Sequence, residues 1–328
     1  MSVANVTDTG EAILRVGPAH AAGLGRIARR LCATGDREVD DPAFLATARQ
    51  LWEEVPAALR RAIREFRRDS GPHGMRVLEG LPVDEAGLPP TPSVRGSVQR
   101  TADVPGALLL LFAHGLGDPV AFRKEKSGAM VQDVVPVPGD EDVQGNVGSV
   151  LLSFHNENAF HAHRPDFVML LCLRADHDGA AGLRTSCVRA AAAGLSEQSR
   201  RVLFQDEFIT EPPPSFGTDG GAAEAHAVLT GAPDDPDVRV DFAATRPLTA
   251  AAETALADLA AQFEKCAHTL VLRPGDLAIV DNRVTVHGRT AFRPRYDGRD
   301  RWLQRTFALT DLRRSRDFRP GDGHVLIR

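Results

Sequence analysis

Three residues in the second half of the chain are of the types that bind a transition metal. His155 and Glu157 are two residues apart in an extended segment, which places the imidazole and the carboxylate on one face. His287 ends an apolar alternation that follows an Asp-Asn turn. Two histidines and one carboxylate form the facial triad that holds iron(II) and leaves adjacent positions open. A surface ion pair and a hydrogen-bonded sheet histidine are the alternative interpretations.

Two arginines follow His287 on a predicted strand. Period-two spacing places Arg301 and Arg305 on the same strand face. Guanidinium groups that face a core are costly unless they meet anions, and arginine binds a carboxylate in a bidentate manner. The pattern therefore predicts carboxylate binding at this strand, with ion pairs to acidic residues inside the fold as the alternative.

The elements that must position these residues change character along the chain. Apolar spacing and the Asp41-Pro42 start predict helices over 44–66, interrupted at Pro56, and over 104–115. A further helix is predicted over 250–265. Strand-forming residues between turns predict short strands over 130–137, 147–154, 167–173, 183–188, 238–242, 269–272, 277–280, 284–287 and 302–309. Many short strands with Gly and Pro turns favour a sandwich or a jelly roll.

These elements predict a single catalytic domain over 1–328, mostly β with α insertions. A mainly helical part, about 1–125, is expected to pack on a jelly-roll core of about 126–328. The Pro-rich stretch 211–217 and the glycines after it predict a lid loop near 208–225. A variable surface loop explains the same composition equally well.

Composition and charge argue against several classes of partner. The 328 residues are 43% hydrophobic and 25% charged, which suits a globular protein with a large core. The formal net charge is −5 and the basic residues form no stripe, so nucleic acid is not expected to bind. The first residues lack a secretory signal, and the apolar runs fall far short of the roughly 20 residues that span a bilayer. We expect a cytoplasmic protein without a membrane partner.

Three strings of residues resemble a known family. They are SFHNENAFH (153–161), RPDFVMLLCLRAD (164–176) and DNRVTVHGRT (281–290). They are similar to the clavaminate synthase-like oxygenases, which use Fe(II), 2-oxoglutarate and O2. Within that family the sequence looks closest to the L-asparagine oxygenases, which form 3-hydroxyasparagine for nonribosomal peptides. The resemblance extends from about 57 to 323 and implies a double-stranded β-helix, or jelly roll, flanked by helices.

The resemblance implies a role for each residue near the metal. His155, Glu157 and His287 would be the Fe(II) ligands. Arg301 would bind the distal carboxylate of the cosubstrate 2-oxoglutarate, and Thr185 would donate a hydrogen bond to it. A carboxylate at position 157 favours hydroxylation, because halogenating relatives need that coordination position for chloride.

The resemblance also implies how the substrate is held. Arg305 would bind its α-carboxylate, while Glu125 and Asn146 would hold its α-amino group and carboxylate end. Asp241 lies near the end of the predicted strand 238–242. If the period-two alternation of this strand points Asp241 inward, it accepts a hydrogen bond from a carboxamide and repels a carboxylate, favouring asparagine over aspartate. The same anion suits a cationic side chain equally well.

The expected function is therefore hydroxylation of free L-asparagine at C3, the β-carbon, for antibiotic biosynthesis. The same chemistry on arginine, ornithine or lysine is the first alternative. An amino acid bound to a carrier protein is the second, and only that case adds a protein partner. A jelly roll that binds a ligand without turnover is the remote third alternative.

Overall fold

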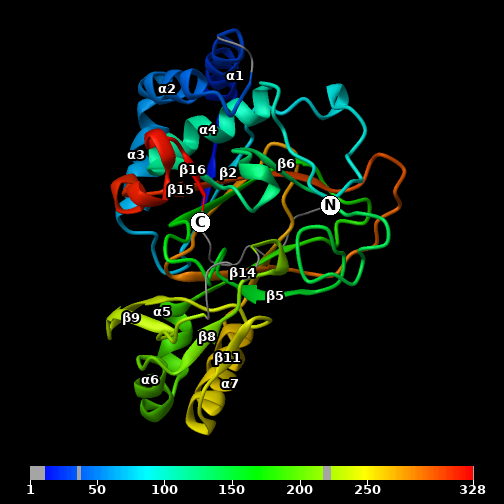
Figure 1. Cartoon of the computed structure of the whole chain (residues 1–328). Helices are drawn as coiled ribbons and strands as arrows, with labels where there is room; N and C mark the ends of the chain where they lie inside the picture. The colour runs from blue at the N-terminus through cyan, green and yellow to red at the C-terminus, as the bar shows by residue number, and fades with distance from the viewer. Residues whose placement is uncertain (1–11, 35–37, 217–222, 328) are drawn as a thin grey trace.

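The computed structural model describes residues 12–34, 38–216 and 223–327 and combines helices with β-sheets. Helices gather at two ends of the molecule, and the two larger sheets lie between them (Figure 1). Within the described ranges, no helix is both long and apolar enough to cross a membrane.

The N-terminal helices pack around one buried helix, α4 (Val104–Leu116). Its neighbours are α1 (Pro18–Cys32), α2 (Pro42–Leu51) and α3 (Ala57–Arg68). Asp41 caps α2 by accepting a 2.6 Å hydrogen bond from the Ala43 amide, and Pro42 takes the first helical position. Pro56 separates α2 from α3, which confirms the predicted break. Because α4 is apolar on all sides, it is covered by these helices on one side and by β6 and β15 on the other.

The larger sheet has eight strands. Its order is β1 (Ile13–Arg15), β2 (Met75–Glu79), β13 (Leu277–Asp281), β6 (Phe167–Arg174), β15 (Trp302–Leu309), β3 (Asp118–Phe122) and β16 (Val325–Leu326), with β4 (Gln132–Val134) also paired to β15. Every residue of β6 and β15 is buried, as expected for strands covered on both faces. The part predicted to be mainly helical, about 1–125, thus supplies β1, β2 and β3 as well as helices.

The smaller sheet carries the two candidate histidines. Its order is β12 (His268–Leu270), β7 (Leu183–Cys187), β14 (Thr285–Arg289) and β5 (Leu152–His155). One apolar cluster contains Leu183 of this sheet together with Leu170, Leu303 and Phe307 of the larger sheet. The two sheets therefore face each other across a common interior.

A third group of elements lies beyond the smaller sheet, in the lower part of Figure 1. It comprises α5 (Val188–Ala191), α6 (Glu197–Leu203), α7 (Ala250–Lys265) and two ribbons, β8 (Phe208–Thr210) with β11 (Thr245–Pro247) and β9 (Leu229–Ala232) with β10 (Asp235–Val238). The helix predicted over 250–265 has these same bounds. Of the expected lid loop near 208–225, residues 217–222 lie outside the described ranges.

Several predicted strands are shorter in the structure. The one predicted over 130–137 is limited to β4, which pairs with β15 only from Leu303 to Arg305. The one predicted over 147–154 begins at Leu152, because its partner β14 ends opposite that residue. The strand predicted over 238–242 ends at Val238, and the chain then runs beside β5 through a single bridge between Asp241 and His155.

Candidate active site

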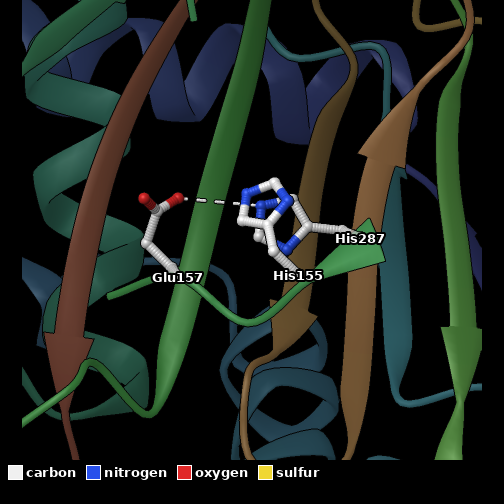
Figure 2. Close-up of side chains that lie close together, drawn as sticks. All are labelled: His155, Glu157 and His287. Atoms are coloured by element: carbon white, nitrogen blue, oxygen red, sulfur yellow. Dashed lines mark ion pairs between the residues drawn. The ribbon is translucent and has the colours of Figure 1, made fainter. Parts of the chain in front are cut away.

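His155, Glu157 and His287 come together in the interior between the two sheets (Figure 2). His155 of β5 is the direct cross-strand partner of His287 of β14, and their ring centroids are 4.3 Å apart. Glu157 follows β5, and its Oε2 lies 3.6 Å from His287 Nε2. One ligand atom from each residue lies within 4.8 Å of the other two. These separations suit coordination of a single cation by all three side chains.

The hydrogen bonds and charges around this triad suit metal binding. His155 Nδ1 is 3.0 Å from the Ser153 carbonyl; a proton on Nδ1 leaves Nε2 free as a ligand atom. Burial, together with the nearby His155, lowers the pKa of His287 to about 4, so its imidazole is neutral at physiological pH. Burial alone would raise the pKa of Glu157, but Arg305 and the two histidines outweigh it and hold the pKa low. Two imidazoles and one carboxylate are a donor set that fits Fe(II).

Two buried asparagines fasten the segment that carries the first two triad residues. Asn282 Oδ1 accepts a 2.7 Å hydrogen bond from the Glu157 amide, and Asn282 Nδ2 donates to the Glu157 carbonyl at 3.1 Å. Asn156 Nδ2 donates to the carbonyls of Asn282 (2.9 Å) and Thr285 (3.1 Å). Glu157 is thereby fixed against the turn that leads into His287. Sequence reasoning did not assign either asparagine to the site, although an Asn in a turn between two apolar strands is a usable signal.

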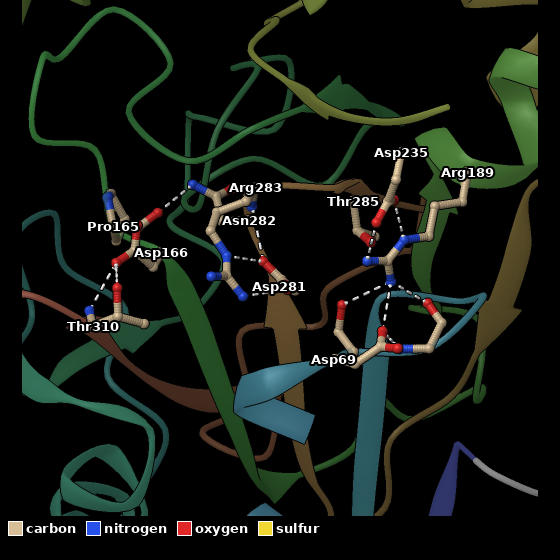
Figure 3. A network of polar contacts seen from close by, with 12 residues as sticks. Asp69, Pro165, Asp166, Arg189, Asp235, Asp281, Asn282, Arg283, Thr285 and Thr310 are labelled. Carbon is tan, nitrogen blue, oxygen red and sulfur yellow. Dashed lines mark hydrogen bonds and ion pairs between the residues drawn. The ribbon is translucent and has the colours of Figure 1, made fainter. Parts of the chain in front are cut away.

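The turn that contains Asn282 is itself anchored to neighbouring elements (Figure 3). The Asn282 amide donates to the Asp166 carbonyl at 2.8 Å. The Asp166 carboxylate in turn accepts hydrogen bonds from the amide and hydroxyl of Thr310, at 2.7 and 2.6 Å. Arg283 forms a 2.7 Å ion pair with Asp281 across the same turn. These bonds link the triad support to the larger sheet through the ends of β6 and β15.

Arg305, on β15 of the larger sheet, is the centre of a buried polar cluster beside the triad. Its Nη1 donates to Glu157 Oε2 at 2.8 Å, and its Nη2 pairs with Glu125 and donates to Gln132 Oε1 at 2.5 Å. When the Asn146 side-chain amide is oriented to suit its neighbours, its Oδ1 accepts hydrogen bonds from both Arg305 Nη atoms at 3.1 Å. The structure therefore brings together three residues predicted for the substrate and adds Gln132, which no sequence motif marked.

The positive charge of Arg305 is met by two carboxylates within the protein. Burial would lower the pKa of Arg305, but Glu157 and Glu125 outweigh it and raise the pKa. Burial raises the pKa of Glu125 in spite of the opposing effect of Arg305. One guanidinium and two carboxylates thus share a desolvated space, which leaves one negative charge for a cationic ligand group or a metal to meet.

Arg301 lies just before β15 in different surroundings. Its side chain is buried, with a residue exposure of 6%, and burial lowers its pKa. Its guanidinium carbon lies 6.0 Å from the ring centroid of Phe292. Among the described residues it has no hydrogen-bond or ion-pair partner. Thr185, the other residue predicted to bind 2-oxoglutarate, is buried on β7 directly opposite His287.

Asp241 is fixed beside His155 by a turn rather than by a strand. Its backbone forms the single bridge to His155, its Oδ1 accepts from the Ala243 amide at 2.9 Å, and its amide donates to Thr245 Oγ1 at 2.9 Å. The period-two argument for its direction therefore does not apply, because β10 has ended at Val238. Proximity to His155 still places Asp241 next to the triad.

Known proteins share this fold and much of this sequence. Residues 72–307 match the model of the taurine catabolism dioxygenase TauD, TfdA family. The L-asparagine oxygenase of Streptomyces coelicolor is 61% identical over 300 residues, covering 92% of this chain and 90% of that protein. Clavaminate synthase 2 of Streptomyces clavuligerus is 35% identical, covering 82% and 84%. A crystal structure of asparagine oxygenase with Fe(II), 2S,3S-3-hydroxyasparagine and succinate superimposes with a TM-score of 0.94 at 58% identity, covering 97% and 99%.

Proposed function

Because the chain belongs to the TauD/TfdA family of dioxygenases, we propose that it hydroxylates free L-asparagine at C3. The protein is a 2-oxoglutarate-dependent oxygenase that uses Fe(II) and 2-oxoglutarate. One observation carries the substrate assignment, namely 61% identity with an L-asparagine oxygenase along nearly the whole chain. The similarity to a structure that contains 3-hydroxyasparagine and succinate supports the same substrate and the same position of attack.

We infer that the two larger sheets form a double-stranded β-helix, or jelly roll, within one catalytic domain. The shared apolar cluster between the sheets supports this fold, as does the position of the triad in their common interior. The N-terminal helices and the group around α7 would then be the helical insertions.

In this proposal His155, Glu157 and His287 would hold the iron, and the iron with 2-oxoglutarate and O2 would supply the oxidant for the substrate carbon, with succinate and CO2 as the products of the cosubstrate. The contribution of the protein is positioning. Asn282 and Asn156 hold the Glu157 carboxylate in position relative to His287, because their hydrogen bonds fix the backbone around Glu157. Burial of Glu157 and His287 limits the access of water to the reacting atoms.

Arg301 would bind the distal carboxylate of 2-oxoglutarate, with Thr185 close to the same ligand. The support for Arg301 is a buried guanidinium without an internal anionic partner, since such a group is costly unless a ligand supplies the anion. For Thr185 the support is its cross-strand position opposite His287.

Arg305 and Glu125 would bind the two charged ends common to every free amino acid. Arg305 Nε is buried without a partner among the described residues, so a donor remains for the α-carboxylate. Glu125 would accept from the α-ammonium group, whose positive charge offsets the second buried carboxylate. Asn146 contacts Arg305 and would complete the carboxylate end. Asp241, beside His155, would accept a hydrogen bond from the asparagine carboxamide.

The test is an assay of the Fe(II)-loaded protein with 2-oxoglutarate against the standard free amino acids, scoring succinate release and the gain of one oxygen atom together. Coupled turnover with asparagine alone supports the proposal and Asp241 as the selector. Coupled turnover with a basic amino acid instead would retain the chemistry and reject the substrate. Absence of coupled turnover with every free amino acid would reject a free substrate and direct the assay to carrier-bound thioesters.

A further inference from the structure

A second buried arginine, Arg289, shares the surroundings of Arg301. It ends β14 two residues after His287 and is the cross-strand partner of Leu183, a member of the apolar cluster between the sheets. Alternation along β14 puts Arg289 on the same face as His287, toward the interior. Arg289 therefore enters from the smaller sheet, whereas Arg301 enters from the larger one.

Both guanidinium groups lie against one aromatic ring. The guanidinium carbons of Arg289 and Arg301 lie 5.1 and 6.0 Å from the ring centroid of Phe292. The two like charges therefore lie near each other and repel. A single small anion beside Phe292 is thus placed to meet both cations.

Neither cation is neutralised by the described part of the protein. Arg289 is only 4% exposed, yet its acceptors are two backbone carbonyls, Gly145 at 3.5 Å and Val150 at 3.0 Å. Its Nε is buried without a partner, and no carboxylate among the described residues pairs with Arg289 or Arg301. Two unneutralised buried charges are costly, and an anionic ligand removes that cost.

We propose that Arg289 is a second binding residue for the distal carboxylate of 2-oxoglutarate, opposite Arg301. The inference rests on the proposed function, since it requires 2-oxoglutarate as cosubstrate. The separation also fits, because two residues along a strand span about 7 Å, which a five-carbon dicarboxylate can bridge from the triad and a shorter oxoacid cannot. Two cations facing one carboxylate would select a 2-oxo acid that carries a second charge at its far end.

Two ligands that differ only at that end provide the test. 2-Oxopentanoate has a methyl group where 2-oxoglutarate has its distal carboxylate. Arg289→Gln is expected to weaken 2-oxoglutarate binding about 10- to 100-fold, the scale of a lost charge-assisted hydrogen bond. The inhibition constant of 2-oxopentanoate and the KM for asparagine should stay unchanged. Calorimetric titration of anaerobic Fe(II)-loaded protein with 2-oxoglutarate gives the affinity independently of turnover.

A matched control and a second variant complete the experiment. Arg184→Gln changes an arginine on the opposite face of the adjacent strand, paired with Glu264, and should leave 2-oxoglutarate affinity unchanged. Without ligands, Arg289→Gln should unfold at the wild-type temperature or above it, because a repelling buried charge has been removed. If that variant does not fold, Arg289→Lys keeps the charge without the planar group and is expected to weaken 2-oxoglutarate binding severalfold.

The outcomes separate this inference from the proposed function. Equal weakening of 2-oxoglutarate and 2-oxopentanoate, or unchanged 2-oxoglutarate affinity in a wild type that hydroxylates asparagine, would overturn the role of Arg289 alone. A wild type that binds no 2-oxoglutarate would overturn both. Selective loss of 2-oxoglutarate affinity in Arg289→Gln would establish the second cation.

Discussion

Arg305 and Arg301 are four residues apart near one end of β15, yet their electrostatic surroundings are opposite. Arg305 meets two buried carboxylates, Glu125 and Glu157, and its charge is neutralised within the protein. Arg301 meets the ring of Phe292 and has no anionic partner among the described residues. The difference indicates that the part of the site around Arg305 is organised before a ligand binds. The part around Arg301 depends on a ligand to supply the neutralising charge.

This contrast fits the two ligands proposed for the site. A free amino acid carries both an α-carboxylate and an α-ammonium group. It can therefore bind to an existing ion-pair cluster without changing the net charge of the site. The distal end of 2-oxoglutarate brings only an anion, and an excess of positive charge is the suitable partner. The distribution of protein charge thus matches a zwitterion at one end and a carboxylate at the other.

Removal of the carboxylate that both the triad and Arg305 use has the largest expected effect. Mutation of a residue that only hydrogen-bonds to a metal ligand typically lowers activity about 10- to 100-fold. Glu157→Ala removes a ligand itself and should lower hydroxylation by more than about 100-fold. Fe(II) affinity, measured by titration under anaerobic conditions, should fall with it. Glu211→Ala, in an exposed ion pair with Arg246, is the control. Normal turnover in Glu157→Ala would refute its assignment as a ligand.

The two arginines can be compared directly by the same substitution. Arg305→Met leaves Glu125 and Glu157 buried without their cation and should reduce the free energy of unfolding by about 3–5 kcal/mol. Arg301→Met removes a buried charge with no ionic partner and should reduce it by less than about 1 kcal/mol, or increase it. Urea unfolding without metal or ligands measures both. Similar losses in the two variants would mean that Arg301 has an internal counterion, and the contrast would be wrong.

Arg305→Met also distinguishes a free substrate from a tethered one. A free amino acid has the α-carboxylate that Arg305 is proposed to bind, so the KM for asparagine should rise strongly. A carrier-bound thioester lacks that carboxylate, and its KM should change little.

The local parts of this site could be predicted from the sequence. β6 and β13 are mainly apolar runs whose burial follows from their own residues, and α7 has its predicted bounds. His155, Glu157 and His287 were candidates from short patterns, and the resemblance to the oxygenase family implied that all three are metal ligands. Residue type and spacing within a few positions carried all of this information.

The long-range parts could not be predicted in the same way. β2 reads as a short segment within a helical region, and it becomes a sheet strand by pairing with β1 and with β13, some two hundred residues later. Gln132 reaches Arg305 because β4 pairs with β15, and Asn282 reaches Glu157 through a turn. The charge imbalance around Arg289 and Arg301 likewise appears only when two strands from different sheets face each other.

A smaller effect is expected at the side-chain end of the substrate. Asp241→Asn should reduce the preference for asparagine over aspartate by about tenfold, because a repelling carboxylate becomes a neutral amide. The ratio of kcat/KM for the two amino acids measures this preference. Asp235→Asn, in the ion pair with Arg189, is the control. If aspartate remains as poor a substrate as before, Asp241 does not discriminate between the two.

The smallest effect concerns the pH dependence of stability at Glu125. Because burial raises the pKa of Glu125 above its ordinary value, the folded protein holds this proton more tightly than the unfolded chain does. The stabilisation is complete below the unfolded pKa, about 4.5, and is lost as pH rises through the folded pKa. Glu125→Gln has no carboxyl group to titrate, so it does not lose stability in this way as pH rises. Its free energy of unfolding relative to wild type should therefore rise with pH over that window. Urea unfolding at a series of pH values measures the slope.

Glu211→Gln provides the control of opposite sign, since Arg246 lowers the pKa of Glu211. Its relative stability should not rise over the window in which that of Glu125→Gln does. A flat or falling slope for Glu125→Gln would mean that Arg305 outweighs burial at Glu125. Glu125 would then remain ionised beside Arg305, and its two carboxylates against one guanidinium would give the cluster a firmer excess negative charge for the α-ammonium group of the substrate.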